Sequence, residues 1–133
     1  MINILITKII YLVSIICDAR SDGYKIKHNK INHTLETLQH IHLFAPLLLW
    51  QVESWQMVWI TVLSYPIMRV GMFNPLINNY RGSTPWHLGD NLIDNALRPL
   101  ARIEQTTRFP ALSLSYFVMS GFGLFLGFTD LFY

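Results

Sequence analysis

Three long apolar runs constrain this chain more than any other feature of its sequence. They cover residues 2–17, 43–68 and 111–133, and only 14% of the 133 residues are charged. Ordinary soluble domains carry about a quarter charged residues, which they need on the surface that faces water. We therefore predict an all-α integral membrane protein, since helices satisfy their own backbone hydrogen bonds in lipid. The alternative is a very apolar soluble subunit that is buried in a complex.

The first run differs from the other two because it is short and interrupted. A crossing takes about 20 residues, whereas residues 2–17 are fewer and include Lys8. A cleaved secretory signal would need a small-residue cleavage site after the run, and the following stretch supplies only Ala19. We expect a retained first helix that continues past the edge of the bilayer.

The second and third runs are both long enough to span a bilayer. The second carries Glu53, and a carboxylate near mid-membrane costs on the order of 3 kcal/mol on insertion scales. Glu53 should therefore point into the bundle, be protonated or have a basic partner. We predict a single membrane domain over residues 1–133, with about three transmembrane helices and an interfacial segment, residues 69–110, between the last two.

The third run contains a pair of glycines, Gly123 and Gly127, that are four residues apart. Small residues at this spacing let two helix backbones approach closely in lipid. The pair predicts either a dimerisation face, which would make the protein a homo-oligomer, or packing against the second helix of the same chain. We prefer the intrachain interpretation.

The charges in the loops do not define a topology. With three crossings the two loops face opposite sides of the membrane, and the positive-inside rule predicts basic residues in only one of them. Either part of residues 66–109 re-enters the bilayer or the first run does not cross. The basic residues are Arg20, Lys25, Lys27 and Lys30 in the first loop and Arg69, Arg81, Arg98, Arg102 and Arg108 in the second.

Helix start and stop signals follow one another through the interfacial segment. Residues 74–82 begin with Asn-Pro and end with Arg-Gly, which is typical of a short helix that Asn caps and Gly ends. Thr-Pro at 84–85 repeats the start signal, and Gly-Asp at 89–90 offers another, for a helix that continues to Ala101. Short capped helices beside membrane runs indicate interfacial or re-entrant structure.

The polar residues of this segment are expected to form one network at the membrane interface. Buried charges in a low dielectric need partners, and basic and acidic residues both lie within short reach. Glu53 or Asp18 could join the network, and Asp18 with Asp22 is otherwise typical of a solvated helix end. The predicted members are Arg69, Asn74, Asn78, Arg81, Asp90 and Asp94.

The stretch WHLGDNLID, residues 86–94, has two interpretations. On one continuous helix, His87, Asp90 and Asp94 would line one face, as metal ligands or acid–base groups can. If Asp90 instead caps a helix, its carboxylate bonds backbone N–H groups and His87 lies outside that helix. We prefer the capping interpretation, and the sequence leaves open whether a metal or another cofactor binds.

Residues Arg69 to Asp94 resemble a pattern in small uncharacterised membrane proteins of bacteria and their phages. In that pattern Arg is followed by an aromatic residue with Asn or Asp, then by Asn, Arg-Gly, an aromatic or His before Gly, and a later Asp. The resemblance implies a membrane setting, which we expect to be a bacterial inner membrane, and a polar cluster, but no reaction. The matching positions here are Arg69, Phe73, Asn74, Asn78, Arg81, Gly82, His87, Gly89 and Asp94, with Asp18, Ala19 and Asp22 as a second part.

Three functional classes remain after the sequence is read. The first is a non-enzymatic membrane protein whose polar network is structural and whose glycines serve packing or assembly. The second is a membrane enzyme in which Arg69 and Arg81 grip the phosphate of a lipid and Asp90 or Asp94 holds a metal or acts as base. The third is a transporter or channel subunit with Glu53 and Asp130 on its path. The net charge of +2 is spread over loops, so we expect no nucleic acid partner.

Overall fold

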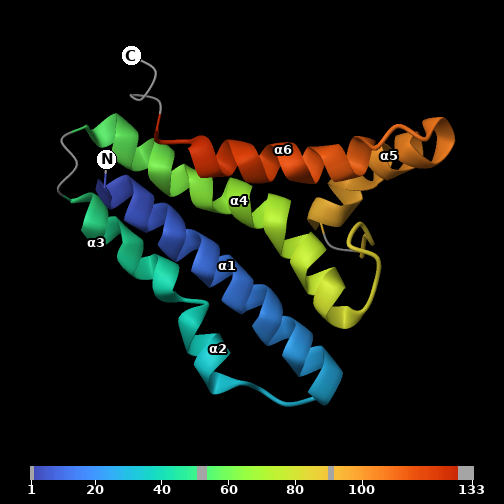
Figure 1. Ribbon diagram of the computed structural model, residues 1–133, viewed down its shortest axis with the longest axis horizontal. Coiled ribbons are helices and arrows are strands. Elements are labelled where there is room, and N and C mark those ends of the chain that lie inside the picture. Colours follow the sequence, from blue (N-terminus) through green and yellow to red (C-terminus); the bar gives the residue numbers. More distant parts are fainter. Residues whose placement is uncertain (1, 51–53, 90–91, 129–133) are drawn as a thin grey trace.

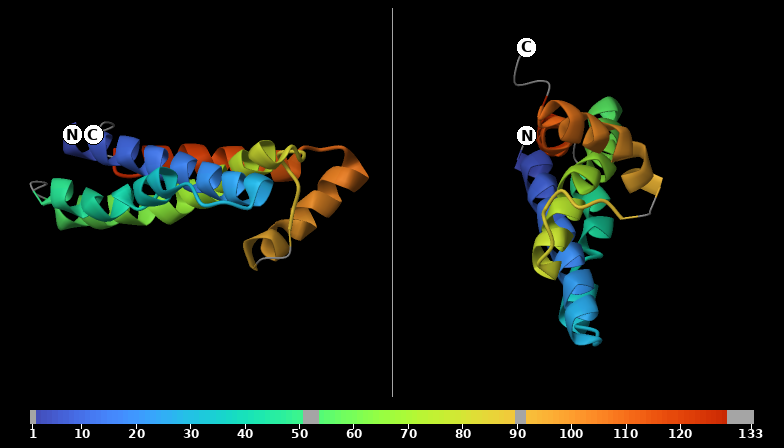
Figure 2. Two further views of the ribbon diagram at one scale, coloured as in Figure 1. Left: turned by 90° about the horizontal axis from the view of Figure 1, so that it is seen from below. Right: turned by 90° about the vertical axis from the view of Figure 1, so that its right-hand side faces the viewer.

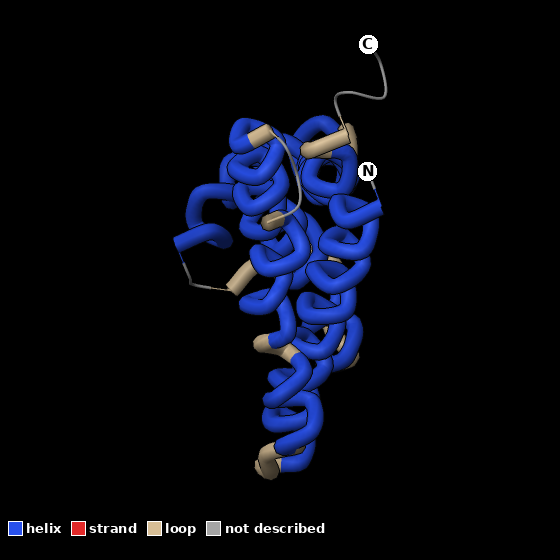
Figure 3. The backbone as a smooth tube through the Cα atoms, turned by 90° about the vertical axis from the view of Figure 1, so that its left-hand side faces the viewer, coloured by secondary structure: helices blue, strands red, loops and turns tan. Residues whose placement is uncertain are grey.

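The computed structural model describes residues 2–50, 54–89 and 92–128. These residues form helices joined by short loops and turns, with no strand among them (Figures 1 and 3). The predicted all-α class is therefore confirmed for the described residues. The elements are α1 (Ile2–His28), α2 (His33–Leu38), the 3₁₀ helix η1 (Ile41–Phe44), α3 (Ala45–Leu49), α4 (Trp55–Arg81), α5 (Leu92–Thr107) and α6 (Ala111–Phe125).

The helices alternate in direction along one bundle (Figure 1). Ile4 at the start of α1, Leu49 at the end of α3 and Met57 at the start of α4 form one apolar cluster. At the other end, Gly23 of α1 lies against Tyr80 of α4. Helices α1 and α4 are therefore parallel and in direct contact, and the α2–η1–α3 segment returns in the opposite direction along the other side of α1 (Figure 1).

Helix α4 is the centre of the bundle, with α1 packed on one side and α6 on another. Where α6 crosses α4, a Cβ atom added to Gly71 would lie 2.5 Å from the backbone N of Ser120. A Cβ on Gly123 would lie 2.8 Å from the backbone N of Met68. Side chains are absent at these points because the two backbones leave no room for them.

We expected the second apolar run to form a single helix, and it does not. It is divided between η1, α3 and α4, and α4 begins at Trp55 with the Ser54 hydroxyl accepting a hydrogen bond from the N–H of Met57. This cap and the return of α3 along α1 outweigh the continuous hydrophobicity, because both helices can then bury apolar residues against α1. Glu53 lies outside the described residues.

The predicted helix start at Asn74-Pro75 is wrong, whereas the predicted end at Gly82 is confirmed. Helix α4 continues through Pro66 and Pro75, because packing of α1 and α6 along it outweighs the backbone hydrogen bonds that proline removes. Gly82 has φ of 75°, a left-handed conformation that favours glycine at a helix end.

Thr84-Pro85 does not start a helix either. These residues lie in a turn in which the His87 N–H donates to the Thr84 carbonyl at 3.0 Å. Helix α5 is present, but it continues to Thr107 rather than Ala101 and includes Pro99. Asp90, its predicted cap, lies outside the described residues.

Two helices, α1 and α4, are long and apolar enough to cross a membrane. Helix α6 has 15 residues, which gives it a length of about 22 Å, so the third predicted crossing is a shorter apolar helix over its described part. Helix α5 diverges from the bundle axis, as the left view of Figure 2 shows.

Both basic loops lie at the same end of the bundle, where the sequence predicted opposite sides. The helices α2, η1 and α3 return along α1, so α4 starts again at the end where α1 starts (Figure 1). The second half of α1 therefore lies at the same end of the bundle as the residues after α4. We call this end, with residues 20–30, 81–89 and 92–108, the basic end. Sequence reasoning missed the return because η1 and α3 are both short and lie inside what reads as one run.

Candidate functional site

Asp94 is the buried centre of the polar residues at the basic end. Its side chain lies in the first turn of α5, and the residue is 4% exposed. One carboxylate oxygen accepts a hydrogen bond from Asn74 Nδ2 at 2.5 Å, and the other accepts from the Gly89 N–H at 2.9 Å. Asp94 therefore joins α5 to α4 and to the loop that precedes α5.

Asn74 extends this connection to α6. Its Nδ2 also donates to the hydroxyl of Tyr116 at 3.2 Å, so one amide group bonds residues of two other helices. The Trp86 ring stacks on Tyr116 with ring centroids 6.0 Å apart. Asn74 therefore does not cap a helix start as predicted. It lies in the interior of α4, where its side chain bonds both α5 and α6.

Asn78, one turn further along α4, holds the loop in place. Its Nδ2 donates to the carbonyls of Pro85 at 3.1 Å and His87 at 2.7 Å. Arg98 adds a bond from Nη2 to the Gly89 carbonyl at 2.8 Å. These side chains therefore supply hydrogen-bond donors to loop carbonyls that have no partner in a helix or sheet.

Arg69 lies apart from this group, in an ion pair with Asp18 of α1. Its Nε and Nη2 both donate to Asp18 Oδ2, at 3.0 and 2.6 Å, and the guanidinium lies 4.3 Å from the ring centre of Phe73. Arg81, in contrast, makes no hydrogen bond or ion pair with the described part of the chain. The two arginines to which the enzyme alternative assigned phosphate binding therefore have different surroundings.

A cavity of about 350 Å³ lies at the centre of these residues. It lies between the end of α1, the second half of α4 and the loop before α5. Among the residues predicted from the sequence it brings together Asn74, Asn78, Arg81, His87 and Asp94, and it adds Asp22. The lining residues are Asp22, Phe73, Asn74, Ile77, Asn78, Arg81, His87, Gly89 and Asp94.

The metal interpretation of residues 86–94 finds no support in the described residues. His87 lies in the loop before α5 and not on the helix of Asp94. Within residues 2–50, 54–89 and 92–128, no group of three His, Cys, Asp or Glu side chains could hold a metal ion.

Lys8 joins three helices, a role that the sequence did not predict, since Lys8 was noted only as a charge that interrupts the first apolar run. It is 3% exposed, and its ammonium donates to the Gly123 carbonyl at 2.9 Å and to the Ser64 hydroxyl. It makes no ion pair with any described residue. A lone charge inside an apolar run was the available signal that this side chain lies between helices.

We expect Lys8→Met to change the free energy of unfolding by no more than about 1 kcal/mol, because an apolar side chain of similar volume often replaces a buried charge without loss. Lys8→Ala should cost about 2 kcal/mol or more, since it leaves a cavity between α1, α4 and α6. Unfolding of the purified protein in mixed micelles measures both. A Met variant as unstable as the Ala variant would show that the ammonium itself is required.

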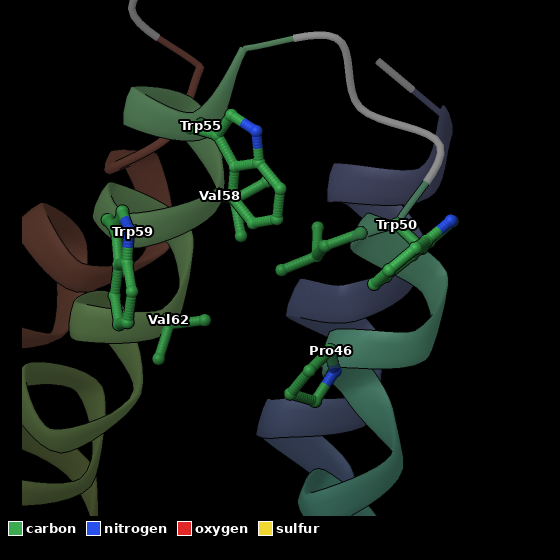
Figure 4. Close-up of a pocket in the computed structure, with 7 residues that line it drawn as sticks. Pro46, Trp50, Trp55, Val58, Trp59 and Val62 are labelled. Atoms are coloured by element: carbon green, nitrogen blue, oxygen red, sulfur yellow. The ribbon is translucent and has the colours of Figure 1, made fainter.

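A second cavity, of about 340 Å³, lies at the opposite end of the bundle and is apolar. Figure 4 shows Pro46 of α3 and Trp50, the residue after α3, on one side of it, and Trp55, Val58, Trp59 and Val62 of α4 on the other. The three tryptophans are 83%, 68% and 62% exposed in chain order. Large indole rings that remain exposed at one end of a bundle are typical of a membrane–water interface.

No protein-family model, curated protein or solved structure matches this chain. The chemistry of the site therefore follows from its own residues. Most of their hydrogen-bonding groups join α4, α5, α6 and the loop to one another, and the remaining ones face the cavity.

Proposed function

We propose that this protein is a small integral membrane protein in which α1 and α4 cross the bilayer and the polar network at the basic end is structural. One observation carries the proposal of a structural network. Both carboxylate oxygens of Asp94 and both amide hydrogens of Asn74 and Asn78 are engaged within the chain. Side chains that are used in this way hold the loop and α5 against the bundle.

The spacing of interfacial residues along α4 supports a membrane setting. Trp59 near its start and Arg81 at its end are separated by a helical length of about 33 Å. The hydrocarbon core of a bilayer is about 30 Å thick. Tryptophan at one end and arginine at the other are the residues that anchor a membrane helix at its two interfaces.

Helix α5 fits a position in the plane of the membrane at the basic end. Leu92 and Ile103 are 87% and 45% exposed, and with Ala96 they lie along one face of the helix. Arg102 and Asn95 lie beside this apolar strip. A helix with an exposed apolar strip and flanking polar residues can lie at the boundary between headgroups and acyl chains.

The basic end should face the cytoplasm under the positive-inside rule, and the bacterial inner membrane is the compartment we propose. Single cysteines at Lys27 and Leu47, in a Cys17→Ser background, test this orientation in intact cells. We expect an impermeant maleimide to label position 47 at once and position 27 only after lysis. Labelling of both from one side, or release of the protein by alkaline carbonate, would contradict the proposal.

A membrane enzyme that acts on a phosphate-bearing lipid is the second candidate, favoured by the polar cavity with Arg81, His87 and Asp94 in its lining. Metal content of the detergent-purified protein, beside Asp94→Asn, separates the candidates. A stoichiometric divalent metal that the variant loses would favour the enzyme. Metal-free preparations with a less stable variant would favour the structural network. Glu53 and Asp130, on which a transport role would depend, lie outside the described residues.

Self-association through the glycine pair has less support than packing within the chain. Gly127 does not share a helix with Gly123, because α6 ends at Phe125 and Gly127 has φ of 90°. A Cβ atom added to Gly123 would meet Met68, and one added to Gly127 would meet Thr61, both on α4 of the same chain. A homo-oligomer would therefore need another surface.

A further inference from the structure

The cavity at the basic end has a buried base and an exposed rim. Ile77, Asn78 and Asp94 are buried, whereas Arg81 and His87 are exposed. Its volume of about 350 Å³ is at the lower end of the range of ligand sites, roughly 300–1,000 Å³. A small polar group could therefore enter from the surface and reach the buried amides.

The base of the cavity has an excess of hydrogen-bond acceptors. A side-chain amide carries two N–H hydrogens and one oxygen, and both hydrogens of Asn74 and of Asn78 are donated elsewhere. Among the described residues nothing donates to the Oδ1 atom of either. Asp22 adds a carboxylate that makes no hydrogen bond or ion pair with this part of the chain.

The cavity is also lined by two opposite charges, Arg81 and Asp22, that form no ion pair in the described structure. Arg81 is nevertheless close enough to Asp22 for their charges to interact. An arginine and a carboxylate that line one cavity without pairing can each bind one charge of a zwitterionic ligand. Arginine binds phosphate through two parallel hydrogen bonds, and an ammonium donates three hydrogen bonds to oxygen acceptors.

We propose that this cavity binds the phosphoethanolamine headgroup of an aminophospholipid. The primary ammonium is held by Asp22 and the amide oxygens of Asn74 and Asn78, and the phosphate is held by Arg81. The lipid source rests on the proposed membrane setting, because the basic end would then lie at headgroup depth. A phosphocholine headgroup fits less well, since its quaternary nitrogen donates no hydrogen bond. Phe73 is the one Phe, Tyr or Trp side chain in the described lining, so the lining provides no cage of such rings for a quaternary ammonium.

Titration of the detergent-purified full-length protein with short-chain lipids, followed by native mass spectrometry, tests the proposal. We expect phosphatidylethanolamine to bind about tenfold or more tightly than phosphatidylcholine, the difference that charge-assisted hydrogen bonds imply. Asp22→Asn should remove this preference, and Arg81→Gln should weaken the binding of both lipids. Glu36→Gln on α2, which contributes no residue to the described lining, is the matched control and should change neither the preference nor the affinity.

Free phosphoethanolamine, titrated in parallel, distinguishes the two sources of the headgroup. Binding of the lipid but not of the free compound supports a membrane lipid as the ligand. Equal binding of the free compound would overturn the lipid source and assign a soluble ligand. Equal affinity for the two lipids, unchanged in Asp22→Asn and Arg81→Gln, would overturn the site itself. Because these titrations use protein in detergent, they can fail while the carbonate and labelling tests of the membrane setting succeed.

Discussion

Asp94→Ala is expected to lower the free energy of unfolding by about 3 kcal/mol. The substitution leaves the Asn74 amide and the Gly89 N–H without their acceptor at a position that is 4% exposed. A buried polar group that loses its partner costs about 1–3 kcal/mol, and more when a charge is involved. Reversible unfolding in mixed micelles of a mild detergent and sodium dodecyl sulfate measures the change.

Two further variants define the cause of this loss. Asp94→Asn keeps one acceptor oxygen, so we expect an effect between those of wild type and Asp94→Ala. Gln105→Ala, an exposed position on the same helix, should change stability by less than about 0.5 kcal/mol. If Asp94→Ala were as stable as Gln105→Ala, the carboxylate would not be holding α5 and the loop to the bundle.

Gly71→Val is expected to separate α6 from α4 and to cost at least about 2 kcal/mol. Its Cβ would lie 2.5 Å from the backbone N of Ser120 and 2.9 Å from the Tyr116 carbonyl. Those neighbours are backbone atoms and cannot move as the end of a flexible side chain can. Overfilling a packed interface typically costs 1–3 kcal/mol, and here the adjustment must come from a shift of a whole helix.

Gly121→Ala on α6 is the control for this prediction. Nothing lies within 4 Å of the Cβ that it would add, so alanine should stabilise the helix by a few tenths of a kcal/mol up to about 1 kcal/mol. Unfolding of the two variants side by side measures the difference. Equal stability of the two variants would contradict the close crossing of α4 and α6.

The sequence was sufficient for the class of fold and for some helix ends. The apolar runs predicted helices, and Arg81-Gly82 predicted where α4 ends, because a left-handed residue after a helix favours glycine whatever surrounds it. Asn74-Pro75 is an equally local signal, but the helix start that it predicted is wrong, because α4 continues through Pro75. Packing on both sides of α4 stabilises the helix by more than the proline costs, and no local pattern reports how many neighbours a helix has.

The members of the site could be collected from the sequence, but their roles could not. Asn74, Asn78, Arg81, His87 and Asp94 were all selected from the interfacial segment, and all line one cavity. Asp22 was interpreted as part of a solvated helix end and as a position in the second part of the resembled pattern, not as a neighbour of Asn78 and Asp94. Nothing in the sequence indicates that the end of α1 lies beside the end of α4. Arg69 was grouped with Arg81 by proximity in sequence, whereas Asp18 binds it from another helix.

The sequence by itself determined that the chain is apolar and helical and that its polar residues are concentrated in the segment before the third apolar run. Hydrophobicity and capping depend on residues within a few turns of one another, so they can be read along the chain. Only the tertiary structure decided that residues 33–49 return along α1 and that both basic segments share one end. It also decided that Lys8 bonds Ser64 and Gly123 across three helices. These contacts join residues far apart in sequence, and they form because the bundle must bury its apolar faces and satisfy its buried polar groups together.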